Sequence, residues 1–204
     1  MNREALCRAV GKVAWGYVLI YLNINFGTVN ILPNWAGCLL FIFALDELGK
    51  WEAPAGRLRP LGWALFCWEL LVWVLAALGL DMSASLWYLP QTLAAVLSLW
   101  FNFQLLTHLA AISDALGLSR GRSIRRLRNF RTVLTTALNL PWGLLLPEDA
   151  IGSYTLEGIL AVAVIAAAIV LIAWTFLALF GLRSELKTPP ETEYTEAEAP
   201  PENK

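Results

Sequence analysis

The composition of this 204-residue chain excludes an ordinary soluble domain. Hydrophobic residues make up 58% of it and charged residues only 15%, and the mean hydropathy is +0.58, outside the usual range of soluble proteins. The formal net charge of −1 averages a basic segment and an acidic tail, so the distribution of charge is more informative than its sum. The apolar runs are continuous and lack the alternation of a membrane β-strand, which predicts an integral membrane protein built from helices.

Six apolar runs are candidate membrane spans. A hydrocarbon core of about 30 Å takes about 20 helical residues. The runs predict an all-α polytopic bundle with transmembrane helices at about 6–25, 34–49, 60–80, 84–112, 130–147 and 156–182. These spans are expected to form one transmembrane domain, residues 1–187. The tail, residues 188–204, is rich in Pro, Glu and Thr, which predicts disorder.

An uncharged polar stretch, INFGTVNILPNWAG at 24–37, separates the first two runs. Pro33 cannot continue a helix, and Asn34 is placed to cap the first turn of the second span. The amides of Asn23 and Asn25 can bond backbone groups that the turn leaves open. A compact hairpin at the membrane surface is one interpretation. The alternative is an irregular polar backbone that lines a cavity at membrane depth, as in transporters with broken helices.

The same stretch carries a likeness to a known group of proteins. A polar–apolar ending to the first helix is followed by an I-L-P-[ND]-aromatic-x-G connection and an apolar helix, through Asn23, Asn25, Gly27, Ile31, Leu32, Pro33, Asn34, Trp35 and Gly37. This pattern resembles small, functionally uncharacterised multi-spanning membrane proteins of Firmicutes, over about the first 45 residues. The resemblance implies a location in a bacterial plasma membrane and brings no known activity.

The basic residues fall on one side of a six-span frame. They precede or open the first span, lie between spans 2 and 3 and between spans 4 and 5, and follow span 6, as Arg3, Arg8, Lys12, Lys50, Arg57, Arg59, Arg120, Arg122, Arg125, Arg126, Arg128, Arg131, Arg183, Lys187 and Lys204. The positive-inside rule then puts both termini in the cytoplasm. Span 5 is short and contains Pro141; if it is re-entrant or tilted instead of crossing, the tail lies outside.

Six of these arginines belong to SRGRSIRRLRNFRT, residues 119–132, which is expected to be a loop just outside the membrane. Anchoring of this loop on the inner side is a sufficient explanation for its charge. The alternative is that Arg122, Arg125, Arg126 and Arg128 bind anionic lipid headgroups, at about 1 kcal/mol for each residue. The expected partners are therefore membrane lipids, and a second copy or another protein. Nucleic acid is not expected, because no nucleic-acid-binding motif accompanies the charge.

Glu69 is the most informative ionisable residue. It lies about 12 Å along the third span from Leu61, close to the bilayer centre, where an unpaired carboxylate costs several kcal/mol and indicates a functional site. Asn139 in span 5 is expected at a similar depth and is the predicted partner, with Tyr17 and Ser98 as alternates. The other interpretation is a protonated Glu69 that bonds a neighbouring helix for packing alone.

Motifs for catalysis and cofactor binding are missing from the sequence. There is one histidine, His108, and Cys7, Cys38 and Cys67 form no C-x-x-C pair, so neither a metal site nor a cofactor is predicted. No nucleophile motif, phosphate-binding loop or dinucleotide fingerprint is present. An enzyme is therefore disfavoured, although an intramembrane active site assembled from separate helices would leave no such motif.

Two functional classes remain. A small-solute transporter or channel would bring Glu69, Asn139, Asn23 and Asn25 together as substrate-binding residues around a polar cavity. A non-catalytic membrane scaffold or interaction subunit would instead have a dry, packed interior. The buried carboxylate favours transport.

Overall fold

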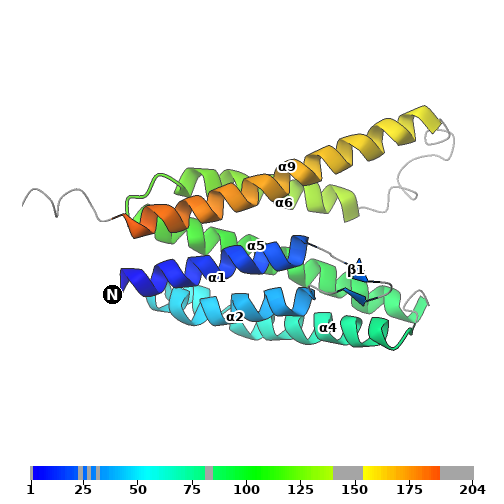
Figure 1. Ribbon diagram of the computed structural model, residues 1–204, viewed down its shortest axis with the longest axis horizontal. Helices are drawn as coiled ribbons and strands as arrows, with labels where there is room; N and C mark the ends of the chain where they lie inside the picture. The colour runs from blue at the N-terminus through cyan, green and yellow to red at the C-terminus, as the bar shows by residue number, and fades with distance from the viewer. Residues whose placement is uncertain are drawn as a thin grey trace, which may run out of the picture.

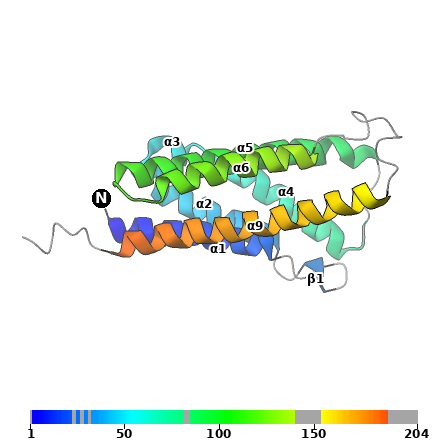
Figure 2. The ribbon, with the colours of Figure 1, turned by 90° about the horizontal axis from the view of Figure 1, so that it is seen from above.

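The computed structural model describes residues 2–22, 25–26, 29–30, 33–80, 85–139 and 154–188. Long helices lie side by side in it, and they alternate in direction along the chain (Figures 1 and 2). They are α1 (Arg3–Tyr21), α2 (Asn34–Trp51), α4 (Arg59–Ala77), α5 (Tyr88–Ala115), α6 (Gly121–Asn139) and α9 (Tyr154–Lys187). Short elements lie at the connections: strands β1 (Asn25–Phe26) and β2 (Val29–Asn30), and helices α3 (Ala53–Gly56) and η1 (Ser85–Trp87). Apart from the short antiparallel pair of β1 and β2, the prediction of an all-helical bundle is confirmed.

Three helical stretches of the described chain are long and apolar enough to cross a membrane. They are Ala53–Ala77, Tyr88–Ala115 and Val162–Lys187. Charged residues lie within α1 and α2, and the first half of α6 is rich in arginine, which lowers the hydropathy of these three helices. The residues of the expected tail beyond Thr188 lie outside the described part of the chain.

The two ends of the bundle differ in chemistry. One end holds the start of α1, the α2–α4 and α5–α6 connections and the end of α9, and the described Lys and Arg residues lie toward it, with Arg131 the farthest along its helix. We call it the basic end. The other end holds the β1–β2 ladder and the α4–α5 connection (Figure 1), and we call it the hairpin end.

Close approach between α1 and α2 depends on glycine. A Cβ atom added to Gly37 would lie 2.7 Å from the carbonyl oxygen of Gly16, and one added to Gly16 would lie 3.0 Å from the carbonyl oxygen of Gly37. Small residues at such crossings let helix backbones meet, which is the usual source of van der Waals contact between membrane helices. The α1–α2 pair is therefore fixed by backbone contact.

The ends of α4 and α5 share one motif. Gly79 and Gly117 have φ angles of +68° and +67°, a conformation that costs glycine little and other residues much more. In each case the next residue, Leu80 or Leu118, donates its N–H to the carbonyl five residues earlier, at 2.9 Å. This is the Schellman arrangement, which ends a helix and satisfies its last carbonyls.

The arginine-rich segment is helical, which corrects the expectation of a loop at 119–132. Helix α6 begins at Gly121, and its residues Ile124 and Leu127 are fully buried. Arginine and leucine favour helix, and apolar residues three to four apart give this helix one face to bury. α6 packs on α5 and α9 through that face.

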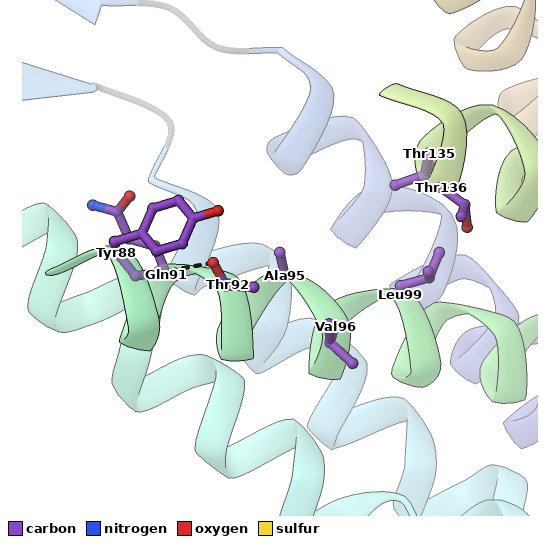
Figure 3. Close-up of a pocket in the computed structure, with 8 residues that line it drawn as sticks. All are labelled: Tyr88, Gln91, Thr92, Ala95, Val96, Leu99, Thr135 and Thr136. Atoms are coloured by element: carbon purple, nitrogen blue, oxygen red, sulfur yellow. Dashed lines mark hydrogen bonds between the residues drawn. The ribbon is translucent and has the colours of Figure 1, made fainter. Parts of the chain in front are cut away.

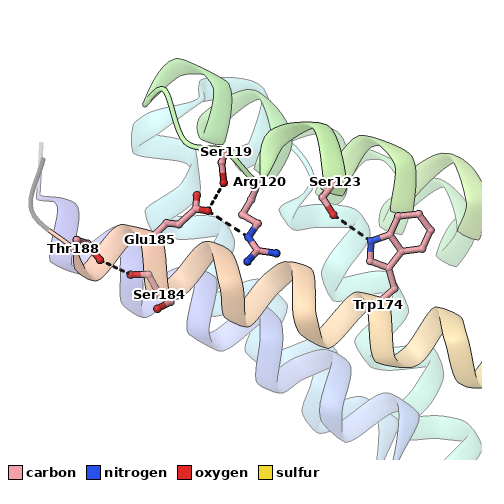
Figure 4. A network of polar contacts seen from close by, with 7 residues as sticks. All are labelled: Ser119, Arg120, Ser123, Trp174, Ser184, Glu185 and Thr188. Atoms are coloured by element: carbon pink, nitrogen blue, oxygen red, sulfur yellow. Dashed lines mark hydrogen bonds and ion pairs between the residues drawn. The ribbon is translucent and has the colours of Figure 1, made fainter. Parts of the chain in front are cut away.

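Polar contacts join the α5–α6 connection and the start of α6 to α9 (Figure 4). Glu185 accepts hydrogen bonds from the hydroxyl of Ser119 and from Nε of Arg120, the latter at 3.3 Å. Within the first turn of α6, Ser123 accepts a hydrogen bond from the indole N–H of Trp174 in α9, at 3.1 Å. The α5–α6 connection is thereby held against α9.

The first and last helices run antiparallel and in contact. Arg3 donates to the backbone oxygen of Glu185 at 3.2 Å, and the thiol of Cys7 donates to that of Arg183 at 3.6 Å. Farther along, the ring of Tyr21 meets that of Phe176 edge-on at 6.1 Å. The start of α1 therefore lies beside the end of α9.

Candidate polar site inside the bundle

A small cavity of about 60 Å³ lies between five helices in the middle of the bundle. Such a volume has room for water and is too small for an organic solute. Five of its lining residues are polar or charged, and the full lining is Ile20, Asn34, Cys38, Phe41, Leu65, Glu69, Ser98, Phe101, Asn102 and Arg131.

Glu69 enters this cavity from α4. Its Oε2 atom accepts a hydrogen bond from the side-chain amide of Asn34 at 3.2 Å. The amide oxygen of Asn34 is buried and has no hydrogen-bond partner. Among the described side chains, no Lys, Arg or His lies within ion-pairing distance of Glu69. The carboxyl group is therefore held by one amide and keeps acceptor capacity for a ligand or water.

A chain of hydrogen bonds joins α1 to α5 beside the carboxyl group. The hydroxyl of Tyr17, which is fully buried, donates to Oδ1 of Asn102 at 2.8 Å. The amide nitrogen of Asn102 donates to the backbone oxygen of Ser98 at 2.7 Å and reaches its hydroxyl at 3.3 Å. These groups satisfy one another, as buried polar groups must, and they give the cavity one rigid wall.

Arg131 supplies a positive charge to the same cavity from α6. Its guanidinium carbon lies 4.8 Å from the ring centre of Tyr17 and 5.4 Å from that of Tyr21. Such cation–π contacts are worth about 0.5–2 kcal/mol each, depending on burial. Its Nη1 atom is buried without a hydrogen-bond partner. Glu69 and Arg131 thus line one cavity with opposite charges and without direct contact.

The carboxyl group also borders an open groove. This groove, of about 410 Å³, lies between α4 and α5, with Trp68, Glu69, Val72, Gln91, Ala94, Ala95 and Ser98 along it. Glu69 and Ser98 line both the enclosed cavity and the groove. These two residues therefore form the partition between the inside of the bundle and its surface.

A second hollow continues toward the hairpin end on the other side of α5 (Figure 3). Its volume is about 550 Å³, and its lining residues come from α5 and α6: Tyr88, Gln91, Thr92, Ala95, Val96, Leu99, Thr135 and Thr136. Gln91 and Ala95 belong to this hollow and to the α4–α5 groove. Polar side chains therefore follow α5 from near its start to the enclosed cavity.

Toward the basic end the interior is closed. The next turns of α5 carry Leu105, Leu106 and Leu109, which are fully buried. They pack in one apolar core with Val13 of α1 and Leu45 of α2. The described part of the polar site is therefore bounded by this apolar core on the side of the basic end.

The predicted site residues have different outcomes. Glu69 and both alternates, Tyr17 and Ser98, meet at or beside the cavity. Asn139 ends α6, but its side chain lies outside the described atoms, as does that of Asn25, and Asn23 lies outside the described residues. The predicted Glu69–Asn139 pairing therefore stays a prediction.

Sequence reasoning missed three members of the site: Asn34, Asn102 and Arg131. Asn34 does not cap α2, because Pro33 occupies the cap position and Asn34 is the first helical residue; its amide is used by Glu69 instead. Arg131 was counted with the loop charges. The signal that identifies it is its spacing of seven and four residues from Ile124 and Leu127, on the apolar face of α6.

Comparisons with known proteins give no match to this chain, whether with family models, with curated proteins or with solved structures. The site must therefore be interpreted from its own chemistry. It offers a carboxyl group, amides, hydroxyls and a guanidinium group. Within the part of the chain that the structure describes, no group of three His, Cys, Asp or Glu residues is placed to hold a metal ion.

Proposed function

We propose that this protein is a small multi-spanning transporter or channel whose solute-binding site is centred on Glu69. One observation carries the proposal: Glu69 lines both a small polar cavity in the middle of the bundle and a wider groove between α4 and α5. Packing alone needs no such opening beside a carboxyl group. A carboxyl group at membrane depth that faces a polar, accessible space is the arrangement typical of a solute or proton pathway.

The proposed topology has six helices that cross a bacterial plasma membrane, with both termini in the cytoplasm. The charge distribution supports it, because the described Lys and Arg residues gather at the basic end and cytoplasmic ends carry the excess of such residues. The hairpin end then faces outward. In this proposal the site opens outward, and the buried layer of Leu105, Leu106 and Leu109 serves as the inner gate.

The chemistry of the site favours a small cationic solute or one rich in hydrogen-bond donors. Glu69 has acceptor capacity left after its bond with Asn34, and Asn34 has a free acceptor oxygen. An uncompensated carboxylate in a membrane is costly, so a cation that binds beside it removes part of that cost. Arg131, on the far wall of the cavity, would repel the same cation and limit how deeply it enters.

Accessibility of Ser98 to water tests this proposal. Ser98→Cys is placed in a background in which Cys7 is replaced by Ala, and Cys38 and Cys67 by Ser, and a small membrane-impermeant thiol reagent is applied to each face of the membrane. We expect labelling from the outside only. Leu105→Cys, seven residues farther along α5, is the matched control and should not react from either side. Absence of labelling at Ser98→Cys from both sides would contradict the proposal and favour the scaffold or interaction-subunit alternative.

A further inference from the structure

A separate groove begins at the basic end, between α1 and α9. Glu69 is not among its lining residues. Its volume is about 490 Å³. Arg8, Lys12 and Arg183 line its charged part, and Trp15, Leu19 and Leu40 line the rest. The groove therefore combines cations with an apolar surface, a pairing that the transport proposal does not use.

The lining residues that α1 contributes lie on one face of that helix. Arg8, Lys12, Trp15 and Leu19 follow one another at spacings of four, three and four residues, so they lie along a single helix face. The helix rises about 10 Å from Lys12 to Leu19. The charge is at the end nearest the start of α1, and the apolar surface runs from there toward the middle of the bundle. Trp15 is held against α9 by an edge-on contact with Phe180 at 5.9 Å.

Two of the three cations that line the groove have no ion-pair partner within the described chain. Arg8 pairs with the exposed Glu4 at 3.0 Å, but neither Lys12 nor Arg183 takes part in an ion pair there. The Nε atom of Arg183 is buried without a hydrogen-bond partner. Gly11 creates the space for this side chain, since a Cβ atom at Gly11 would lie 3.0 Å from that Nε atom.

We propose that this groove binds an anionic phospholipid, with the phosphate between Lys12 and Arg183 and an acyl chain along Trp15, Leu19 and Leu40. The lipid supplies both the negative charge and the apolar chain that the groove complements, and the cytoplasmic leaflet, where the proposed topology puts the basic end, is rich in anionic lipids. Cations near a membrane surface attract such lipids at about 1 kcal/mol each.

This groove is a better lipid site than the arginines of α6. Arg125 is paired with Asp114. Arg128 donates to Thr107 at 3.0 Å and lies over the ring of Phe103 at 4.5 Å. Two of the four arginines considered in the sequence are therefore already engaged. Arg122 and Arg126, the remaining two, are exposed and provide a matched control.

The experiment uses the full chain, purified in neutral detergent, with native mass spectrometry and thermal unfolding as readouts. Phosphatidylglycerol and phosphatidylcholine are added at equal concentration. We expect the wild type to retain phosphatidylglycerol preferentially and to unfold at a higher temperature with it. Lys12→Gln/Arg183→Gln should lose this preference by about tenfold or more, because two phosphate contacts are removed. Arg122→Gln/Arg126→Gln removes the same charge and should keep it.

Lys12→Glu is a second variant, for use if the double variant does not fold. Lys12 is exposed, so its substitution should not disturb the packing of α1. This variant should also lose the preference. If the α6 control lost as much of the phosphatidylglycerol preference, the lipid would be attracted by net charge only. If both groove variants kept the preference, the lipid would bind elsewhere. A shift of the same size with glycerol 3-phosphate alone would mean an anion site without an acyl-chain groove. Each of these results overturns the proposal, and none depends on transport.

Discussion

Among the described residues, the half of the bundle near the basic end is closely packed, whereas the half near the hairpin end has many exposed apolar side chains. On α5 alone, Leu105, Leu106 and Leu109 are fully buried, but Leu89 and Leu93, nearer the hairpin end, are 77% and 57% exposed. Exposed apolar surface on this scale marks an interaction site or a membrane contact. In a bilayer, lipid chains would cover it.

Along α9 the same contrast recurs. Leu179 and Leu182 are buried, while Val162 and Ile165 are exposed. The polar cavity lies where the two regimes meet, around Asn102 and Glu69. Within the described residues the site therefore borders a packed apolar core toward the basic end, while a hollow and a groove extend along α5 toward the hairpin end.

The largest expected effect comes from breaking the α1–α2 contact on which the packed half depends. Gly37→Leu should cost about 3 kcal/mol or more, because its side chain would meet the backbone oxygen of Gly16. Thermal unfolding and the yield of monodisperse protein in detergent measure it. Ala36→Leu is the neighbouring control at a less buried position and should cost much less. Equal stability of the two variants would show that the close approach is unimportant.

The contrast between the halves can be tested with one substitution made twice on one helix. Leu105→Ala should lower the free energy of unfolding by about 2 kcal/mol or more, because it leaves a cavity in a closely packed region. Leu93→Ala removes the same atoms from an exposed position and should change it by less than about 0.5 kcal/mol. Chemical denaturation in mixed micelles gives both values. Similar losses would mean that the two halves are equally packed.

A smaller effect is expected from the hydrogen bond between Tyr17 and Asn102. A double-mutant cycle of Tyr17→Phe and Asn102→Ala should give a coupling energy of about 0.6 kcal/mol, the average for hydrogen bonds between membrane helices, and of about 1.7 kcal/mol at most. Thr92→Ala in place of Asn102→Ala should show no coupling with Tyr17→Phe, because Thr92 bonds its own helix backbone. A coupling energy near zero in the first cycle would mean that the polar wall is not maintained in the membrane.

Only a small effect on stability is expected from Glu69→Gln, because glutamine has nearly the same shape and can still accept the hydrogen bond from Asn34. Its free energy of unfolding should change by less than about 1 kcal/mol. Uptake of a small cationic solute into proteoliposomes should nevertheless fall at least tenfold, since the negative charge is lost. Leu93→Ala serves as the transport control. Undiminished uptake by Glu69→Gln would remove Glu69 from the proposed pathway.

The sequence predicts those features of the fold that depend on local composition. Long apolar runs indicate helices, and positive charge placed between alternate runs indicates which ends lie together. Glu69 is conspicuous for the same reason, because a carboxyl group within an apolar run is rare. The number of spans that cross the membrane and the side on which the termini lie remain predictions.

The partners of Glu69 were not predictable in this way. They depend on how each helix is rotated about its axis, which is set by contacts between helices such as Gly16 with Gly37. A rotation decides whether Asn34 faces the cavity or caps its own helix, and whether Arg131 belongs to a surface charge cluster or to the interior. The start of α6 was predicted too late in the chain, because hydropathy identifies only the apolar part of a helix. Its arginine-rich first turns are helical because of helix propensity and one buried face.

The contact between α1 and α9 has a consequence for biosynthesis. The thiol of Cys7 meets a backbone group 176 residues later in the chain. At translation rates of about 5–20 residues per second, the synthesis of α9 follows that of the α1 face it covers by roughly 10–35 s. During that time other surfaces, such as the insertion machinery or neighbouring lipid, must shield Arg3 and Cys7. The contact forms only after α9 has been made, so a nascent chain stalled before α9 should be a substrate for membrane quality-control proteases.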